Sequence, residues 1–173
     1  SSGTLVGNTI TNNIVSPSAL AARGGGIVLD GCTNVTLVDN VLDHNTGAEN
    51  GGGLYVINST GIDVQGGIIT RHTVSSSGGG ARLESAGVAF RGVRFSRNAS
   101  SLTDGALIAT NGSTLQVDDC EFLWNTAFVY AGANASNSPA SVRHSLFVGN
   151  SGVVGGGLAL GTVASGSVLG NTF

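Results

Sequence analysis

The sequence predicts an all-β fold: a single-stranded, right-handed parallel β-helix of about six to seven turns, each with 25–27 residues and three short strands. Three observations predict it. A triple glycine begins at Gly24, Gly51 and Gly78, so it returns every 27 residues. Apolar and polar residues alternate within each repeat, as in a strand with two different faces. No stretch of ten residues shows the 3.6-residue spacing of an amphipathic helix.

Each repeat closes on an apolar residue that is followed, three positions later, by a polar one. A fixed period of this length is typical of a solenoid. We expect the apolar residues to stack in the core and the polar ones to form a hydrogen-bonded ladder, because an amide both donates and accepts. His72 should interrupt that ladder. The apolar column is Ile10, Leu42, Ile69, Phe95, Phe122, Phe147 and Phe173; the polar column is Asn13, Asn45, His72, Asn98, Asn125 and Asn150.

Three strand-like segments follow one another in each repeat. The first comes directly after the glycines, as in "IVL", "LYV", "LIA" and "LAL". The second is the alternating segment "NVTLV", "GIDVQ", "GVAFR" or "TLQVD". The third contains the closing apolar residue. The glycines then mark one corner of each turn, where a positive φ or a close backbone approach suits them.

Residues 1–173 form one repetitive domain, and its two ends resemble each other ("SSGTLVGNTI" and "ASGSVLGNTF"). We therefore expect a segment of a larger protein, stacked on further coils of its own chain or on neighbouring copies. The net charge of −3 and the absence of lysine argue against a nucleic-acid partner. No apolar run is long enough to span a membrane. Cys32 and Cys120 fall about three turns apart, too far for a disulfide, and Cys120 should be a buried thiol.

The paired motifs "FSRN", "FLWN", "FVGN" and "GGGI", "GGGL" resemble the FxxN and GG[ALVI] repeats of chlamydial polymorphic outer membrane proteins. Similar repeats occur in other pectin-lyase-like β-helix surface proteins. The resemblance covers nearly the whole chain and implies an adhesin-like β-helix outside the cell. The sequence departs from the motif at Leu42, Ile69 and His72, and in "AGANAS" at 131–136. It therefore favours an extracellular β-helix more than chlamydial adhesion.

A catalytic site on this fold would need carboxylates that share one outward column on neighbouring turns. The columns of Asp39, Asp43 and Asp63 continue mainly with uncharged residues. Only Asp118, Asp119 and Glu121 lie close together. His44, His72 and His144 fall in three different columns, which argues against a histidine metal site. We expect no catalytic residue, no cofactor and no metal site in this segment.

Two outward columns place opposite charges on neighbouring turns. Arg91 and Arg143 should flank Asp118, and Arg94 should reach Glu121. A third column places Arg97 beside Trp124, within reach of a cation–π contact. These contacts would fix the register in which the turns stack.

Five Asn-x-Ser/Thr sequons are present, and an excess of them is weak evidence for secretion. Asn98 belongs to the inward column and should be unreachable. The candidate glycosylation sites are Asn34, Asn58, Asn111 and Asn134.

The sequence thus favours a non-catalytic structural or adhesive β-helix, located outside the cell or on its surface, within a large surface or filament-forming protein. Cell-surface or matrix glycans are candidate partners. An alternative is a fragment of a carbohydrate-active, pectate-lyase-like enzyme with its site elsewhere. An ice-binding helix would need flat outward rows of threonine, and the outward columns here are mixed.

Overall fold

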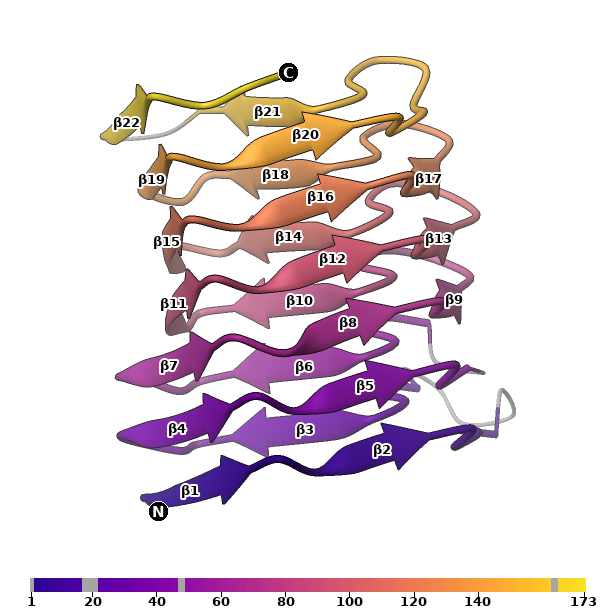
Figure 1. Ribbon diagram of the computed structural model, residues 1–173, viewed down its shortest axis with the longest axis vertical. Helices are drawn as coiled ribbons and strands as arrows, with labels where there is room; N and C mark the ends of the chain where they lie inside the picture. Colours follow the sequence, from indigo (N-terminus) through magenta and orange to yellow (C-terminus); the bar gives the residue numbers. More distant parts are fainter. Residues whose placement is uncertain (1, 17–21, 47–48, 163–164) are drawn as a thin grey trace.

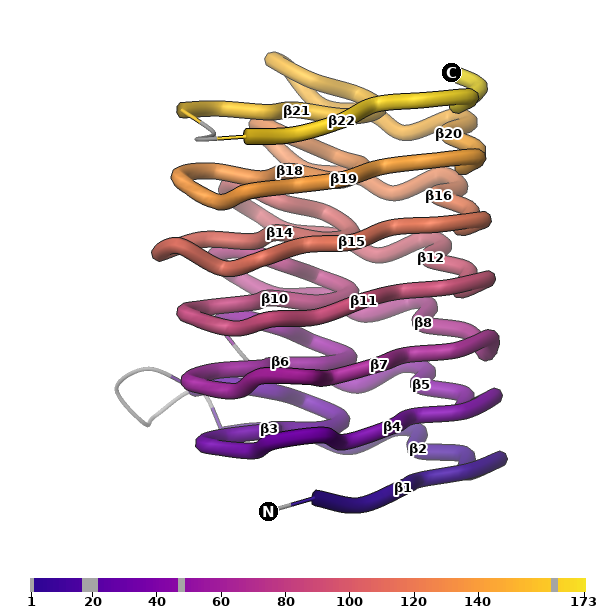
Figure 2. The backbone as a smooth tube through the Cα atoms, turned by 90° about the vertical axis from the view of Figure 1, so that its left-hand side faces the viewer, coloured from indigo at the N-terminus to yellow at the C-terminus, as the bar shows by residue number. Residues whose placement is uncertain are grey.

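The computed structural model describes residues 2–16, 22–46, 49–162 and 165–173. The chain winds into a stack of coils, with its N-terminus at one end and its C-terminus at the other (Figure 1). Successive strands of a sheet come from successive coils and run parallel, as Figure 2 shows for β4, β7, β11, β15 and β19. No helix is present among the described residues.

Three parallel sheets form the sides of the coil. The seven-stranded sheet contains β1 (Gly3–Val6), β4 (Val35–Val38), β7 (Ile62–Gln65), β11 (Gly87–Arg91), β15 (Thr114–Asp118), β19 (Ala140–Arg143) and β22 (Gly166–Leu169). One six-stranded sheet contains β2 (Thr9–Thr11), β5 (Val41–Asp43), β8 (Ile68–Thr70), β12 (Arg94–Ser96), β16 (Glu121–Leu123) and β20 (Leu146–Val148). The other contains β3 (Ile27–Asp30), β6 (Leu54–Ile57), β10 (Ala81–Glu84), β14 (Leu107–Thr110), β18 (Ala133–Ser136) and β21 (Leu158–Gly161).

A fourth, three-stranded sheet was not predicted. Its strands directly follow β8, β12 and β16 along the chain, in the middle coils. Its strands have only two residues each, which is too short for an alternating pattern to be visible in the sequence. They are β9 (Thr73–Val74), β13 (Ala99–Ser100) and β17 (Thr126–Ala127).

The predicted all-β parallel β-helix is thus the observed fold, and the predicted register agrees with the strand pairing. Phe95 pairs with Ile69 on one side and with Phe122 on the other. Arg91 pairs with Gln65 and with Asp118. Each coil therefore places equivalent residues directly above one another, on the inside and on the outside.

The triple glycines form one corner of the coil, as predicted, for two physical reasons. The first glycine has a left-handed backbone, with φ of 63° at Gly51 and 66° at Gly78. The second glycine lies against the backbone of the next coil: a Cβ atom on Gly52 would be 2.5 Å from the carbonyl oxygen of Gly79. A side chain at that position would force the two coils apart.

The core is a narrow column of aliphatic and aromatic side chains that point inward from the three main sheets. Leu54, Leu83, Leu107 and Phe90 have no exposed surface. Phe90 also packs edge-on against Phe95, with ring centroids 5.3 Å apart. Stacking like on like buries these side chains although each coil alone is too thin to have a core.

Candidate functional site

The asparagine column forms a buried ladder along the coil axis. The Asn98 backbone N–H and side-chain Nδ2 both donate to Oδ1 of Asn125, at 3.0 and 3.1 Å. Asn98 Nδ2 also donates to the Ile69 carbonyl oxygen at 2.9 Å. Asn13 bonds to Asn45, and Asn125 to Asn150, in the same way. The side-chain amides of Asn98 and Asn125 thus bond to the coil before and to the coil after, and those of Asn45 and Asn150 bond to the coil before.

His72 continues this ladder, so the expected interruption is wrong. The His72 backbone N–H donates to Asn98 Oδ1 at 3.2 Å, and the Asn45 backbone N–H donates to His72 Nδ1 at 3.0 Å. His72 Nε2 lies 3.0 Å from the Leu42 carbonyl oxygen. The neutral imidazole with its proton on Nε2 satisfies both contacts, because Nδ1 then accepts as an amide oxygen does and Nε2 donates as an amide nitrogen does. Burial lowers the pKa of His72 to about 4, which favours this neutral form.

Two further corners carry buried polar side chains that the sequence reasoning missed. At one, Ser59 Oγ accepts from the Cys32 backbone N–H at 2.9 Å, and Ser113 Oγ accepts from Ala86 N–H at 3.1 Å. At the other, Asn40 Oδ1 accepts from the Asn8 backbone N–H at 2.9 Å. Asn171 Oδ1 does the same for the Ser145 N–H. Each corner thus satisfies a backbone donor that turns away from the strand ladder.

The aromatic members of the closing column stack ring over ring. Phe95 and Phe122 are 5.0 Å apart with an interplanar angle of 1°, and Phe122 and Phe147 are 4.6 Å apart with an angle of 2°. Phe173 stacks on Phe147 at 5.0 Å but is 68% exposed, so its expected place inside the core is wrong. Leu42 and Ile69 are buried, and Ile10 is partly buried, lower in the same column.

The outward charge pairs form in part. Arg94 Nε donates to Glu121 Oε2 at 2.5 Å, and the Arg97 guanidinium carbon lies 5.7 Å from the Trp124 ring centroid. The expected Arg91–Asp118 ion pair is wrong, although the two residues are register partners. Arg91 instead binds Asp63, on the preceding coil, because its long side chain reaches diagonally across the sheet.

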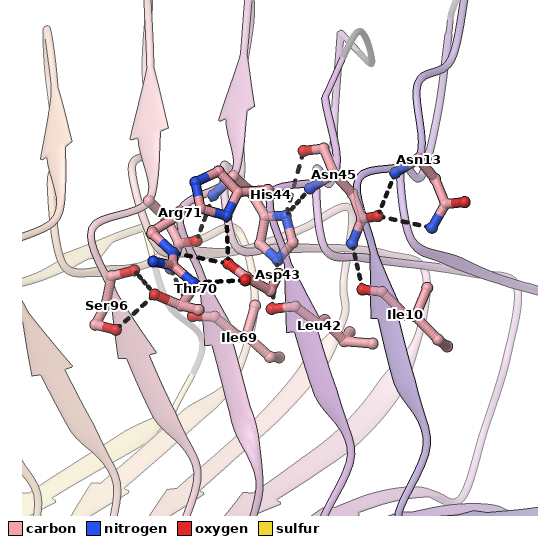
Figure 3. Close-up of polar contacts among 12 residues, drawn as sticks. Ile10, Asn13, Leu42, Asp43, His44, Asn45, Ile69, Thr70, Arg71 and Ser96 are labelled. Atoms are coloured by element: carbon pink, nitrogen blue, oxygen red, sulfur yellow. Dashed lines mark hydrogen bonds and ion pairs between the residues drawn. The ribbon is translucent and has the colours of Figure 1, made fainter.

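Asp43 lies between the side chains of Arg71 and His44 on the outer corner of the coil (Figure 3). Arg71 donates to both of its carboxylate oxygens, at 2.8 and 2.6 Å, and His44 Nδ1 lies 2.8 Å from Oδ1. The hydrogen bond from Arg71 lowers the pKa of Asp43 and raises that of Arg71. This bidentate geometry fixes the orientation of Arg71.

A second outward group consists of Asp118, Asp119 and His144. His144 Nδ1 lies 3.0 Å from Asp118 Oδ1, and one ligand atom from each of the three residues falls within 4.8 Å of the others. His144 thus approaches the two aspartates, and no second histidine joins them among the described residues. A hollow of about 220 Å³ next to this group is lined by Arg91, Gln116, Asp118, Ser141 and Arg143 together with Phe90 and Val117. Within this group His144 and Asp118 contact one another directly.

A polar network lies against the outer face of the sheet β6-β10-β14-β18. The Tyr55 hydroxyl donates to Glu84 Oε2 at 2.5 Å. Burial of the hydroxyl and, second, this hydrogen bond raise the pKa of Tyr55 to about 12. Asn134 Nδ2 donates to Asp104 Oδ1 at 2.8 Å. Asn134 is 5% exposed, so its assignment as a candidate glycosylation site is wrong for the folded chain.

The other sequons lie as follows. Asn34, Asn58 and Asn111 are exposed at turns, where a glycan could be accommodated. Asn98 is fully buried in the ladder.

Cys120 is also buried, as predicted. Burial raises the pKa of its thiol to about 11, so it is an inert core residue.

These features define the class of protein: a solenoid whose coils are joined by buried polar ladders and an aromatic stack. The family whose model matches, over residues 1–173, is described as the right handed beta helix region, and the chain belongs to this family. Searches of curated proteins and of solved structures gave no match. Within the described ranges, no helix is long and apolar enough to cross a membrane.

Proposed function

We propose that this chain is a non-catalytic β-helix of the cell exterior, which serves as a rigid scaffold and presents an adhesive outer surface. It would act within a larger surface or filament-forming protein, stacked on further coils or on neighbouring copies. The FxxN and GG[ALVI] motifs, which resemble those of adhesin-like outer membrane proteins, support this role.

The observation that carries the proposal is the continuity of the axial contacts. The amide ladder runs through the imidazole of His72, and the stack Phe95–Phe122–Phe147 lies parallel to it. The ladder joins each coil to the next by side chains as well as by strand pairing, and the stack does the same from the coil of Phe95 onward. The polar side chains of the ladder thereby serve structure, and the outer surface is left to make contacts.

A carbohydrate-active enzyme is a second candidate, and one observation favours it. Asp118 and Asp119 bring two carboxylates together with His144, beside a hollow on the outer face of the seven-stranded sheet. Two carboxylates on one sugar bond are the usual machinery of glycoside hydrolysis. The contact between His144 Nδ1 and Asp118 Oδ1 argues for a structural role of Asp118, since it occupies one of the two carboxylate oxygens.

The test measures adhesion and hydrolysis on the same preparation. Beads coated with the purified chain are incubated with panels of cells and of immobilised matrix polysaccharides, and retention under flow is scored. Soluble polysaccharides are incubated in parallel, and released reducing ends or unsaturated sugars are measured. We expect retention without product. Product formation that is abolished by Asp118→Asn would overturn the proposal and establish the enzyme; a failure to adhere to any surface would contradict the adhesive role.

A further inference from the structure

Trp124 is the only tryptophan of the chain, and it is 53% exposed. It occupies the corner position directly before the buried ladder residue Asn125. Its backbone is left-handed, with φ of 53°, as is that of Arg97 on the preceding coil. A left-handed corner next to an inward asparagine turns the indole away from the core. A large aromatic surface is thus presented to solvent rather than used in packing.

Gly149 provides the space in which the indole lies. It occupies the equivalent corner on the next coil and has φ of 65°. A Cβ atom on Gly149 would lie 2.4 Å from Cδ1 of Trp124 and 2.7 Å from Nε1. The Cδ1–Nε1 edge of the indole therefore occupies the space that a side chain at position 149 would take, and the exposed ring forms a platform at this corner.

The Arg97 guanidinium supplies a positive charge over the ring of this platform. Its carbon lies 5.7 Å from the ring centroid, and no carboxylate lies within 4 Å of it in the part of the chain that is described. Arg71, on the coil before, is by contrast neutralised by Asp43. Thr126 and Ser151, two residues beyond the corner on adjacent coils, are exposed and carry hydroxyl groups.

We infer that Trp124 and Arg97 form a binding site for an anionic saccharide, that is, a pyranose ring that bears a carboxylate or a sulfate group. The apolar C–H face of a pyranose matches an exposed indole, and a guanidinium binds a carboxylate or a sulfate through two parallel N–H groups. The hydroxyls of Thr126 and Ser151 add hydrogen-bonding groups beside the platform. This inference rests on the proposed adhesive function and names the partner class of that surface.

The single tryptophan makes the test direct, because fluorescence excited at a wavelength that the two tyrosines do not absorb reports on this residue alone. Oligogalacturonate, a sulfated dextran oligosaccharide and neutral dextran are titrated into the purified full chain, and binding is checked by calorimetry. We expect a saturable fluorescence change with one or both anionic sugars, with a Kd of roughly 0.1–1 mM, as is reasonable for one ring and one ion pair. Which anionic sugar binds distinguishes a carboxylate from a sulfate.

Variants then separate the two residues. Arg97→Ala should weaken anionic binding about tenfold and leave neutral dextran unaffected, and Arg97→Lys should recover only part of the loss. Trp124→Ala should abolish calorimetric binding. Arg71→Ala removes an exposed arginine at the equivalent corner, where Asp43 already neutralises it, and should change nothing.

Three results would overturn the inference: equal affinity for neutral and anionic dextran, unchanged binding by Arg97→Ala, or no fluorescence or heat change at about 10 mM sugar. If the beads still adhere to cells in any of these cases, the adhesive function stands and only this site is wrong. If adhesion and saccharide binding both fail, the proposed function fails with it.

Discussion

His72 and Asn98 lie on adjacent coils in the same column, and both side chains are fully buried. Each accepts a backbone N–H from the coil before it and donates to a carbonyl oxygen of that coil. At the scale of the residue, a side chain fits this column if it carries one hydrogen-bond acceptor and one donor at the right separation. It does not have to be an amide. Neutral imidazole meets that condition and imidazolium does not, because Nδ1 would then present a proton to the Asn45 N–H.

The pH dependence of stability follows from this state of His72. Its pKa is about 4 in the folded chain, against 6.5 for the free side chain. The unfolded chain therefore takes up a proton first as the pH falls, so the stabilisation is complete above about pH 6.5 and is lost progressively toward pH 4. The difference corresponds to about 3 kcal/mol. Urea unfolding between pH 7.5 and 4 should show this loss, and His72→Asn should largely remove it. An identical pH profile for the two proteins would contradict the assignment.

Asn98→Ala tests the ladder itself. The substitution leaves the His72 backbone N–H and the Ile69 carbonyl oxygen without their side-chain partner. Leaving such buried groups unsatisfied should cost about 1–3 kcal/mol of unfolding free energy. Ser101→Ala, at an exposed turn without a left-handed backbone, is the control and should change stability by less than about 0.5 kcal/mol. Equal effects of the two substitutions would show that the ladder does not contribute to stability.

At the scale of the element, β12, β16 and β20 are three-residue strands, each of which contributes one inward ring. Strands this short are marginal alone, and the stacked phenylalanines hold them in register. The middle ring of Phe122 has an aromatic partner on both sides, whereas Phe173 has one.

Phe122→Ala should therefore cost about 3–5 kcal/mol, because it removes two stacked contacts and leaves a cavity in a fully buried position. Phe173→Ala should cost much less, since that ring is 68% exposed. Thermal and urea unfolding of both variants measure the difference. A loss below about 1 kcal/mol for Phe122→Ala would place this residue outside the effective core.

The Arg94–Glu121 pair joins β12 to β16 on the outside. Both side chains are well exposed, so a double-mutant cycle should give a coupling of about 0–1 kcal/mol that decreases with salt. A coupling of several kcal/mol that is insensitive to salt would mean that the pair is desolvated in solution.

The same elements show what the sequence could and could not predict. Inward columns were readable because alternation and period fix which residue stacks on which, as for Phe95 and Phe122. The ion pairs of long outward side chains could not be predicted, because Arg91 can reach either Asp63 or Asp118 from one backbone position. Asn134 was misplaced because it is buried and donates to Asp104 of the preceding coil, a side-chain contact that the alternation of inward and outward residues does not reveal. The serine corners at Ser59 and Ser113 were missed because serine is frequent throughout the chain.

At the scale of the whole molecule, each coil pairs only with the coil before it and the coil after it. Stability is then a sum of terms between neighbours, and burial varies along the axis. The inward residues of β14 have no exposed surface, whereas all four residues of β22 are exposed.

Amide hydrogen exchange of the 173-residue chain should therefore be slowest in β10–β16 and fastest in β22. Mass spectrometry of peptides after exchange measures the gradient. Uniform protection along the axis would show that the chain opens as one cooperative unit.

The ladder has a consequence for how such a chain changes in evolution. Each coil offers the coil before it the same acceptor and the same donor at the same corner, whether the residue is asparagine or histidine. A coil can therefore follow any other coil without new complementary substitutions. Unequal crossing-over that duplicates or deletes the gene segment for one whole repeat keeps the reading frame and the contacts intact. Rod length can thus vary among descendants while the local structure of every coil stays the same.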